Sequence, residues 1–192
     1  MCNVPNRAEA GLSVFAKAYK LVTKGLDITV ERVVKYMITS QITLSCAESC
    51  TGGLVAEAVT RVPGASAIFK GGVVSYSEEI KQQVLGVRAE TLSKHTVYSA
   101  EVANEMSIGV MMLMKTDASI GITGIAGPGG GTEDKPVGTV YVSVRYKERE
   151  AVKDLRLYEE YESMDRELIR LLSAQRALEM LESLLKNESE GK

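Results

Sequence analysis

The stretch ITLSCAESCTGGLVA, residues 42–56, decides the fold class because it predicts a strand, a sharp turn and a helix in succession. The apolar run Ile42–Cys46 is of β type, small polar residues break it, and residues 51–56 open a helix. Ser49 lies at the corner, where free backbone N–H groups and the helix dipole favour negative charge. A nucleophile and an oxyanion site can share such a corner. From this segment alone, however, a helix N-cap at Ser49 or Thr51 is the simpler interpretation.

A second segment, TGIAGPGGGT at residues 123–132, follows another apolar run, Ala118–Ile122. Its glycines leave little side chain to pack and let the backbone approach a ligand closely. The segment matches neither the Walker A pattern nor the dinucleotide-binding fingerprint. We interpret it as a loop that binds an anion or an amide, with a long flexible turn as the alternative.

The remaining apolar patterns predict helices mixed with strands. The expected helices cover 8–23, 27–39, 51–61, 78–85, 100–115 and 165–185, and the expected strands cover 42–46, 68–75, 118–123, 137–146 and 150–158. Gly25 is expected to end the first helix, and Gly71-Gly72 to mark a bulge or a close contact in strand 68–75. With its closing hairpin, this pattern predicts an α/β protein, a three-layer α/β/α sandwich with a mixed β-sheet.

The composition is that of a soluble globular domain, with 192 residues, 45% of them hydrophobic and 25% charged. A net charge of −2 gives no electrostatic reason to expect nucleic acid or an anionic membrane as a partner. The chain lacks the apolar stretch of roughly 18 residues that a membrane span needs. Residues 1–7 also lack the apolar core of a signal peptide, so the expected location is cytoplasmic.

The three cysteines, Cys2, Cys46 and Cys50, are an odd count and do not resemble a disulfide framework. They lack zinc-ligand spacing and the chain has a single histidine, so neither a metal nor a cofactor is expected. Cys50 neighbours Ser49, and a thiolate at a helix N-terminus is a good nucleophile. A small buried residue is the simpler interpretation of Cys50.

A serine nucleophile needs a base, and the sequence offers His95 or Lys81. His95 lies in a charged, turn-like stretch, and no pattern marks a carboxylate that would orient it. Tyr76 and Lys81 lie where a strand ends and a helix begins, which places both near the same sheet edge as Ser49. A lysine in a dry pocket loses its preference for charge and can act as a base, with a tyrosine hydroxyl assisting. Taken alone, Lys81 is typical of a solvated helix residue.

Four motifs carry a resemblance to a known family: AESCTGG at 47–53, YSEEIK at 76–81 followed by LGV, TGIAGPGGG at 123–131, and KPVGTV at 135–140. Together they resemble the C-terminal domain of the CinA family, competence/damage-inducible protein homologues also known as nicotinamide-nucleotide amidases of the PncC type. The resemblance runs from about residue 27 to 186. It divides the chain into an N-terminal helical extension at 1–26, an amidase domain at 27–187 and a disordered tail at 188–192.

The resemblance implies hydrolysis of the carboxamide of nicotinamide mononucleotide, giving nicotinic acid mononucleotide and ammonia. It implies a metal-free site in which Ser49 attacks, Lys81 takes the proton and Tyr76 assists. The substrate-binding residues expected with it are Thr51, Gly52, Thr123, Gly124, Gly129, Gly130 and Arg166. Arg166 and the loop donors are the candidates for the phosphate. Backbone N–H groups at the start of the Thr51 helix or of the glycine-rich loop are the candidates for the oxyanion. The expected partners are a small-molecule nucleotide and further copies of the chain, as a homodimer or higher homo-oligomer.

Two positions depart from the family pattern. Glu78 stands where the family commonly has Asn, and its carboxylate is expected to raise the pKa of Lys81 and weaken it as a base. Met164 stands where the family usually has Gly, close before Arg166. Glu78 and the extra N-terminal helix motivate a second hypothesis, a catalytically silent domain that binds nucleotides or regulates a partner. Ammonia release from nicotinamide mononucleotide separates the two hypotheses.

Overall fold

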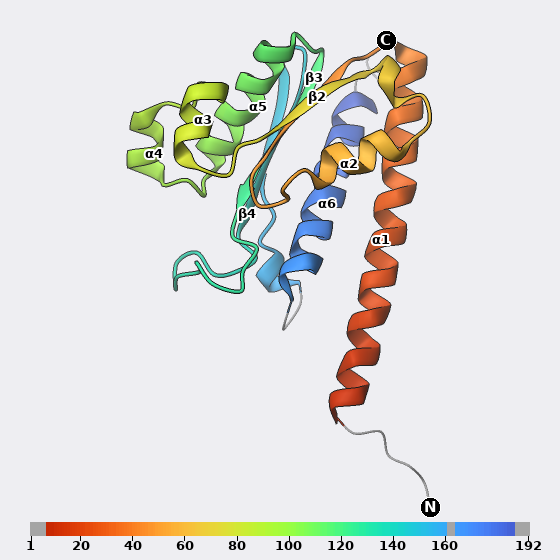
Figure 1. The fold of residues 1–192 in the computed structure, drawn as a ribbon, viewed down its shortest axis with the longest axis vertical. Helices are drawn as coiled ribbons and strands as arrows, with labels where there is room; N and C mark the ends of the chain where they lie inside the picture. Colours follow the sequence, from red (N-terminus) through yellow and green to blue (C-terminus); the bar gives the residue numbers. More distant parts are fainter. Residues whose placement is uncertain (1–6, 161–163, 187–192) are drawn as a thin grey trace, which may run out of the picture.

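A five-stranded mixed sheet forms the centre of the computed structural model, which describes residues 7–160 and 164–186 (Figure 1). The strand order is β2-β1-β3-β4-β5. The strands are β1 Leu44–Glu48, β2 Phe69–Val74, β3 Ala118–Gly124, β4 Val140–Tyr146 and β5 Arg149–Asp154. β1 pairs in parallel with β2 and β3, whereas β4 runs antiparallel to β3 and β5. The predicted mixed sheet is therefore confirmed.

Helices cover both faces of this sheet (Figure 1). One face carries α2 Leu54–Arg61 and α6 Arg166–Lys186, with the long helix α1 Arg7–Ser40 packed on them. The other face carries α5 Ala100–Met114, with α3 Glu78–Leu85 and α4 Ala89–His95 packed on it. Two short 3₁₀ turns, Ala65–Ala67 and Leu157–Glu159, complete the described elements. The buried apolar residues divide into a large cluster on the α1/α6 side and a smaller one on the α5 side, as a three-layer α/β/α sandwich requires.

The first helix corrects one sequence prediction, because Gly25 does not end it. α1 is a single helix of 34 residues where two helices were predicted. Val22 and Leu26 are buried on either side of Gly25, so the apolar stripe continues through it. A Cβ added at Gly25 would lie 2.8 Å from the Gln175 side-chain nitrogen on α6. Gly25 therefore allows α1 and α6 to approach closely. The expected border between residues 26 and 27 falls inside this helix, and the predicted tail at 188–192 lies outside the described residues.

Two glycines also explain why α2 begins at Leu54 and not near residue 51 as predicted. Gly52 and Gly53 have φ angles of 63° and 97°, a left-handed conformation that a right-handed helix cannot include.

The predicted irregularity in β2 is confirmed. Its register to β1 shifts between Leu44 and Ser45, and a Cβ on Gly72 would lie 2.7 Å from the Cys46 sulfur.

Close packing of α5 on α3 makes Gly109 sensitive to substitution. A Cβ added at Gly109 would lie 1.9 Å from the backbone oxygen of Leu85, the last residue of α3. We expect Gly109→Ala to lower the free energy of unfolding by about 1–3 kcal/mol, because overpacking outweighs the gain in helix propensity. Urea denaturation measures this. Gly25→Ala is the matched control, because the flexible Gln175 side chain can move aside. An equal response of the two variants would contradict the prediction.

Candidate active site

The site lies at the point where the strand order changes direction. The chain leaves β1 through α2 to β2 on one side, and returns through α5 to β3 on the other side of β1. In open α/β sheets, ligands bind at the carboxyl ends of the strands at such a point. Ser49 directly follows β1, and the glycine-rich loop directly follows β3. Two segments distant in sequence are thus brought to one edge of the sheet.

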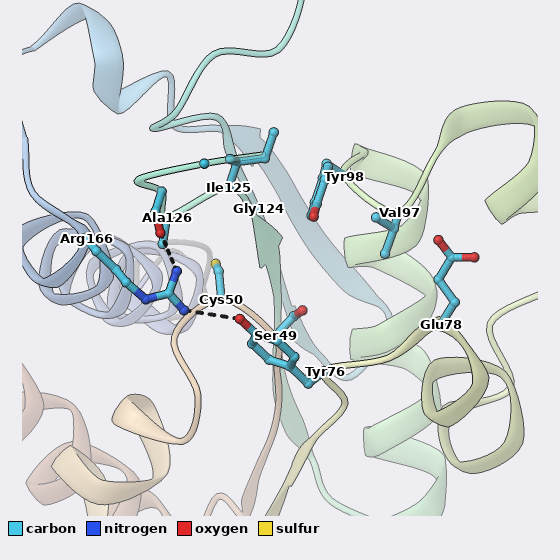
Figure 2. A pocket seen from close by; sticks show the side chains of 12 residues that line it. Ser49, Cys50, Tyr76, Glu78, Val97, Tyr98, Gly124, Ile125, Ala126 and Arg166 are labelled. Atoms are coloured by element: carbon cyan, nitrogen blue, oxygen red, sulfur yellow. Dashed lines mark hydrogen bonds between the residues drawn. The ribbon is translucent and has the colours of Figure 1, made fainter. Parts of the chain in front are cut away.

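A cavity of about 260 Å³ occupies this edge (Figure 2). Its lining comes from the turn after β1, the β2–α3 connection, the α4–α5 connection, the glycine-rich loop and the start of α6. The lining residues are Ser49, Cys50, Tyr76, Glu78, Val97, Tyr98, Gly124, Ile125, Ala126, Gly127, Gly129 and Arg166. Figure 2 shows Arg166 and Glu78 on opposite sides of the cavity, with Ser49 and Tyr76 between them.

Lys81 is hydrogen-bonded to Ser49 although its side chain comes from a different layer of the fold. Its Nζ lies 3.0 Å from the Ser49 Oγ and donates a second bond of 2.5 Å to the backbone oxygen of Ser75. Lys81 is completely buried, whereas its sequence context taken alone predicts a solvent-exposed lysine on a helix. α3 explains this placement, because its fourth residue turns inward towards the end of β1 while its exposed face carries Glu79 and Gln83.

Burial also sets the protonation of this lysine. Desolvation lowers the pKa of Lys81 from its ordinary value of 10.5 to about 8, and the negative charge of Glu78 opposes the shift. Glu78 therefore acts in the direction expected from the sequence, but the effect of burial is larger. A substantial fraction of Lys81 is neutral at mildly alkaline pH, as a base for the Ser49 hydroxyl must be.

Cys50 lies next to Ser49 but is not activated as a nucleophile. Its side chain is buried, which confirms the simpler interpretation made from the sequence. Desolvation raises the pKa of the Cys50 thiol to about 12. Near neutral pH the group is therefore a thiol and a poor nucleophile, which favours Ser49 as the attacking residue.

Arg166 connects three segments around the cavity. Its Nη2 donates a bond of 3.1 Å to the Tyr76 hydroxyl, and its Nη1 donates a bond of 2.6 Å to the backbone oxygen of Gly127 (Figure 2). The unusual Met164 is half-buried against the core, and Arg166 still reaches the cavity. Tyr76 is bonded to Arg166, and within residues 7–160 and 164–186 it makes no hydrogen bond to Ser49 or Lys81.

Sequence reasoning missed Glu48, which immediately precedes Ser49. Its carboxylate is 1% exposed and accepts bonds from the N–H groups of Gly53, Val55 and Ala56 at 2.9–3.1 Å. Glu48 thus occupies the positive end of α2 and caps it. The prediction that Ser49 or Thr51 caps this helix is wrong. Because Glu48 takes up three N–H groups at the helix start, the glycine-rich loop is the better of the two predicted positions for the oxyanion. The sequence signal that could have revealed this cap is an acidic residue shortly before a helix start.

Four further predicted residues lie outside the lining of this cavity. The Thr51 side chain is buried in the core, and Gly52 forms the left-handed turn before α2. The Thr123 hydroxyl donates a bond of 2.9 Å to the backbone oxygen of Val97, so it positions a cavity wall. Gly130 lines a neighbouring cavity.

The structure also bears on three further expectations from the sequence: a histidine base, a metal site and a membrane span. His95, expected in a turn, lies at the end of the unpredicted helix α4, with its Nδ1 3.3 Å from Glu101, and it does not line the Ser49 cavity. Within the part of the chain that the structure describes, no cluster of three His, Cys, Asp or Glu residues could hold a metal ion. No described helix is long and apolar enough to cross a membrane.

Comparisons with known proteins agree on one family. A family model described as the CinA C-terminal domain matches residues 27–185. A CinA-like protein of Thermotoga maritima is 45% identical over 157 residues, which are 81% of this chain and 37% of that protein. The chain spans about a third of the length of the curated relatives it matches first.

Solved structures give the same result for the fold. The competence/damage inducible protein of Agrobacterium tumefaciens superposes with a TM-score of 0.80 at 34% identity, covering 83% of this chain and 95% of that one. A CinA superfamily protein of Klebsiella pneumoniae gives 0.79 at 33% identity, covering 84% of this chain and 98% of that one.

Proposed function

The chain belongs to the CinA C-terminal domain family, and from that premise we propose that it is a serine-type amidohydrolase that deamidates nicotinamide mononucleotide. The products are nicotinic acid mononucleotide and ammonia. The contact between the Ser49 hydroxyl and the buried amine of Lys81 carries the proposal, because a hydroxyl paired with a neutral amine in a dry site is an activated nucleophile.

The reaction starts when the Ser49 Oγ attacks the carboxamide carbon and Lys81 takes the hydroxyl proton. The oxyanion forms beside the backbone of residues 124–129, since Glu48 already occupies three N–H groups at the start of α2. Lys81 then gives its proton to the departing nitrogen, which leaves as ammonia. Water, deprotonated by the same amine, releases the acyl group from Ser49.

Arg166 and Tyr76 act together in this proposal. The bond between them joins the start of α6 to the β2–α3 connection, and the second bond of Arg166 fixes Gly127 in the glycine-rich loop. Because both side chains line the cavity, they hold the loop against the substrate. The Tyr76 hydroxyl already accepts a bond from Arg166. Tyr76 therefore assists by holding Arg166 in place and by positioning the bound amide.

Incubation of the purified chain with nicotinamide mononucleotide tests the proposal. We expect ammonia and nicotinic acid mononucleotide to form in equal amounts, measured by an ammonia assay and by chromatography. EDTA is expected to leave the rate unchanged, because Ser49 and Lys81 supply both the nucleophile and the base. Binding of the nucleotide without ammonia at any pH would support the silent binding domain.

A further inference from the structure

The Ser49 cavity continues into a second cavity of about 400 Å³. The two share four lining residues, Glu78, Val97, Tyr98 and Ile125. The second cavity extends to Leu92, Thr96, Gly130, Thr132 and Lys135. At about 260 Å³ the Ser49 cavity is smaller than the roughly 300–1,000 Å³ typical of small-molecule sites. The shared walls therefore indicate one cleft with two compartments.

Lys135 supplies a positive charge in the second compartment. Its Nζ donates bonds to the backbone oxygen of Tyr98 at 2.7 Å, to the Thr96 hydroxyl at 2.9 Å and to the backbone oxygen of His95 at 3.4 Å. All three acceptors are neutral, and no ion pair of Lys135 with a carboxylate is found within residues 7–160 and 164–186. The ammonium therefore keeps its net charge, and its longest bond is the one that an anionic ligand can replace.

The wall beside Lys135 is held in a strained conformation. Thr96 has φ 65° and ψ 167°, a region populated almost only by glycine. The Lys135 bond to its hydroxyl and the bond from its N–H to the Leu92 oxygen hold it there. Val97 and Tyr98 follow directly and line both compartments. The contacts of Lys135 thus fix the passage between the compartments.

Glu78 lies in the shared wall of the two compartments, whereas Arg166 lies on the opposite side of Ser49 (Figure 2). From Ser49 outward, the cleft therefore presents a nucleophile, then a carboxylate, then an ammonium. A nucleotide with a cationic base has the matching order: a carboxamide, a positively charged ring and a phosphate. Arg166, on the far side of Ser49, uses two of its N–H groups on Tyr76 and Gly127.

We propose that the second compartment is the phosphate subsite of the cleft, with the phosphate of a cationic-base nucleotide held at Lys135 and its ring beside Glu78. The inference rests on the proposed amidase function and deepens it. The sequence suggested Arg166 and the donors of the glycine-rich loop for the phosphate, and the proposal replaces Arg166 by Lys135. It also gives the departure at Glu78 a role in selecting a cationic ring.

The test compares nicotinamide mononucleotide with nicotinamide riboside, which carries the same amide and the same cationic ring but no phosphate. We expect the wild type to prefer the phosphorylated substrate in kcat/KM. Lys135→Gln should lose at least about tenfold of that preference, measured as the ratio of kcat/KM on the two substrates, because a change in the cavity wall affects both substrates alike and cancels in the ratio, whereas the loss of the charge-assisted contact affects only the phosphorylated one. Lys135→Arg should retain the preference. Lys94→Gln, which changes an exposed lysine of α4, is the matched control.

Three outcomes would overturn the subsite. The first is a Lys135→Gln variant that keeps the preference while Arg166→Gln loses it, which would place the phosphate at Arg166. The second is an equal loss on both substrates, which would show that Lys135 acts only through the cavity wall.

If the wild type hydrolyses neither substrate, the proposed function fails, and calorimetric binding of ribose 5-phosphate decides the subsite. Weaker binding to Lys135→Gln than to the wild type would then support it, and equal binding is the third overturning outcome.

Discussion

Ser49→Ala is expected to abolish ammonia release from nicotinamide mononucleotide, with a loss of several orders of magnitude in kcat. The variant removes the only atom that forms the covalent bond, and the Lys81 amine is left without a hydroxyl to deprotonate. The fold should persist, because Ser49 lies at a cavity wall and the capping of α2 depends on Glu48. Single-turnover kinetics measure the loss, and urea denaturation checks the fold.

Cys50→Ala is the matched control at the next position. Because the pKa of the Cys50 thiol is raised to about 12, its loss should leave most of the activity. A dead Cys50→Ala with an active Ser49→Ala would reverse the assignment of the nucleophile. Nucleotide binding should survive in both variants, so loss of binding in Ser49→Ala would show that the serine acts in recognition.

Local signals were enough for most of the elements. α3 was predicted with the bounds Glu78–Leu85 that the structure gives. In the structure Ser77 caps its start, and Gly86 ends it in a left-handed conformation. Gly25 was misread because the sequence does not reveal what packs against a helical glycine. The partner that explains it, Gln175, lies on the last helix of the chain. Whether a glycine ends a helix or admits a neighbour is decided by tertiary contacts.

In the candidate site, too, local signals identify some residues, and tertiary contacts decide the placement of the others. Ser49, Tyr76 and Arg166 were singled out from the sequence and line one cavity. The burial of Lys81 could not be predicted from its own helix, because it depends on how α3 packs on α5 below the end of β1. The helix start after Ser49 was one of two candidate positions for the oxyanion, beside the glycine-rich loop. A side chain of the chain itself, Glu48, takes that place, and sequence spacing alone does not distinguish the two.

Lys81 gives the second large effect, through the pH dependence of the reaction. If neutral Lys81 accepts the Ser49 proton, kcat/KM should rise with pH through about 8, the pKa of the buried amine. Lys81→Arg should lose activity by orders of magnitude at every usable pH, because a guanidinium stays protonated. Glu78→Asn should shift the rising limb to lower pH, since the Glu78 charge raises the pKa of Lys81. A fully active Lys81→Arg would remove Lys81 from the mechanism.

Stability measurements test the burial of Lys81 independently of catalysis. The unfolded chain binds the Lys81 proton up to its ordinary pKa of 10.5, whereas the folded chain releases it near pH 8. Between these values the unfolded state holds more protons, so the free energy of unfolding should rise with pH across this window and should lose that gain as the pH falls back through 8. Lys81→Met carries no proton and should lack this rise. It should also be more stable than the wild type near pH 7, where folding must bury the ammonium. A wild type and a Lys81→Met variant with the same slope between pH 8 and 10.5 would show that Lys81 is solvated, and the Ser49–Lys81 pair would lose its physical basis as a nucleophile and base.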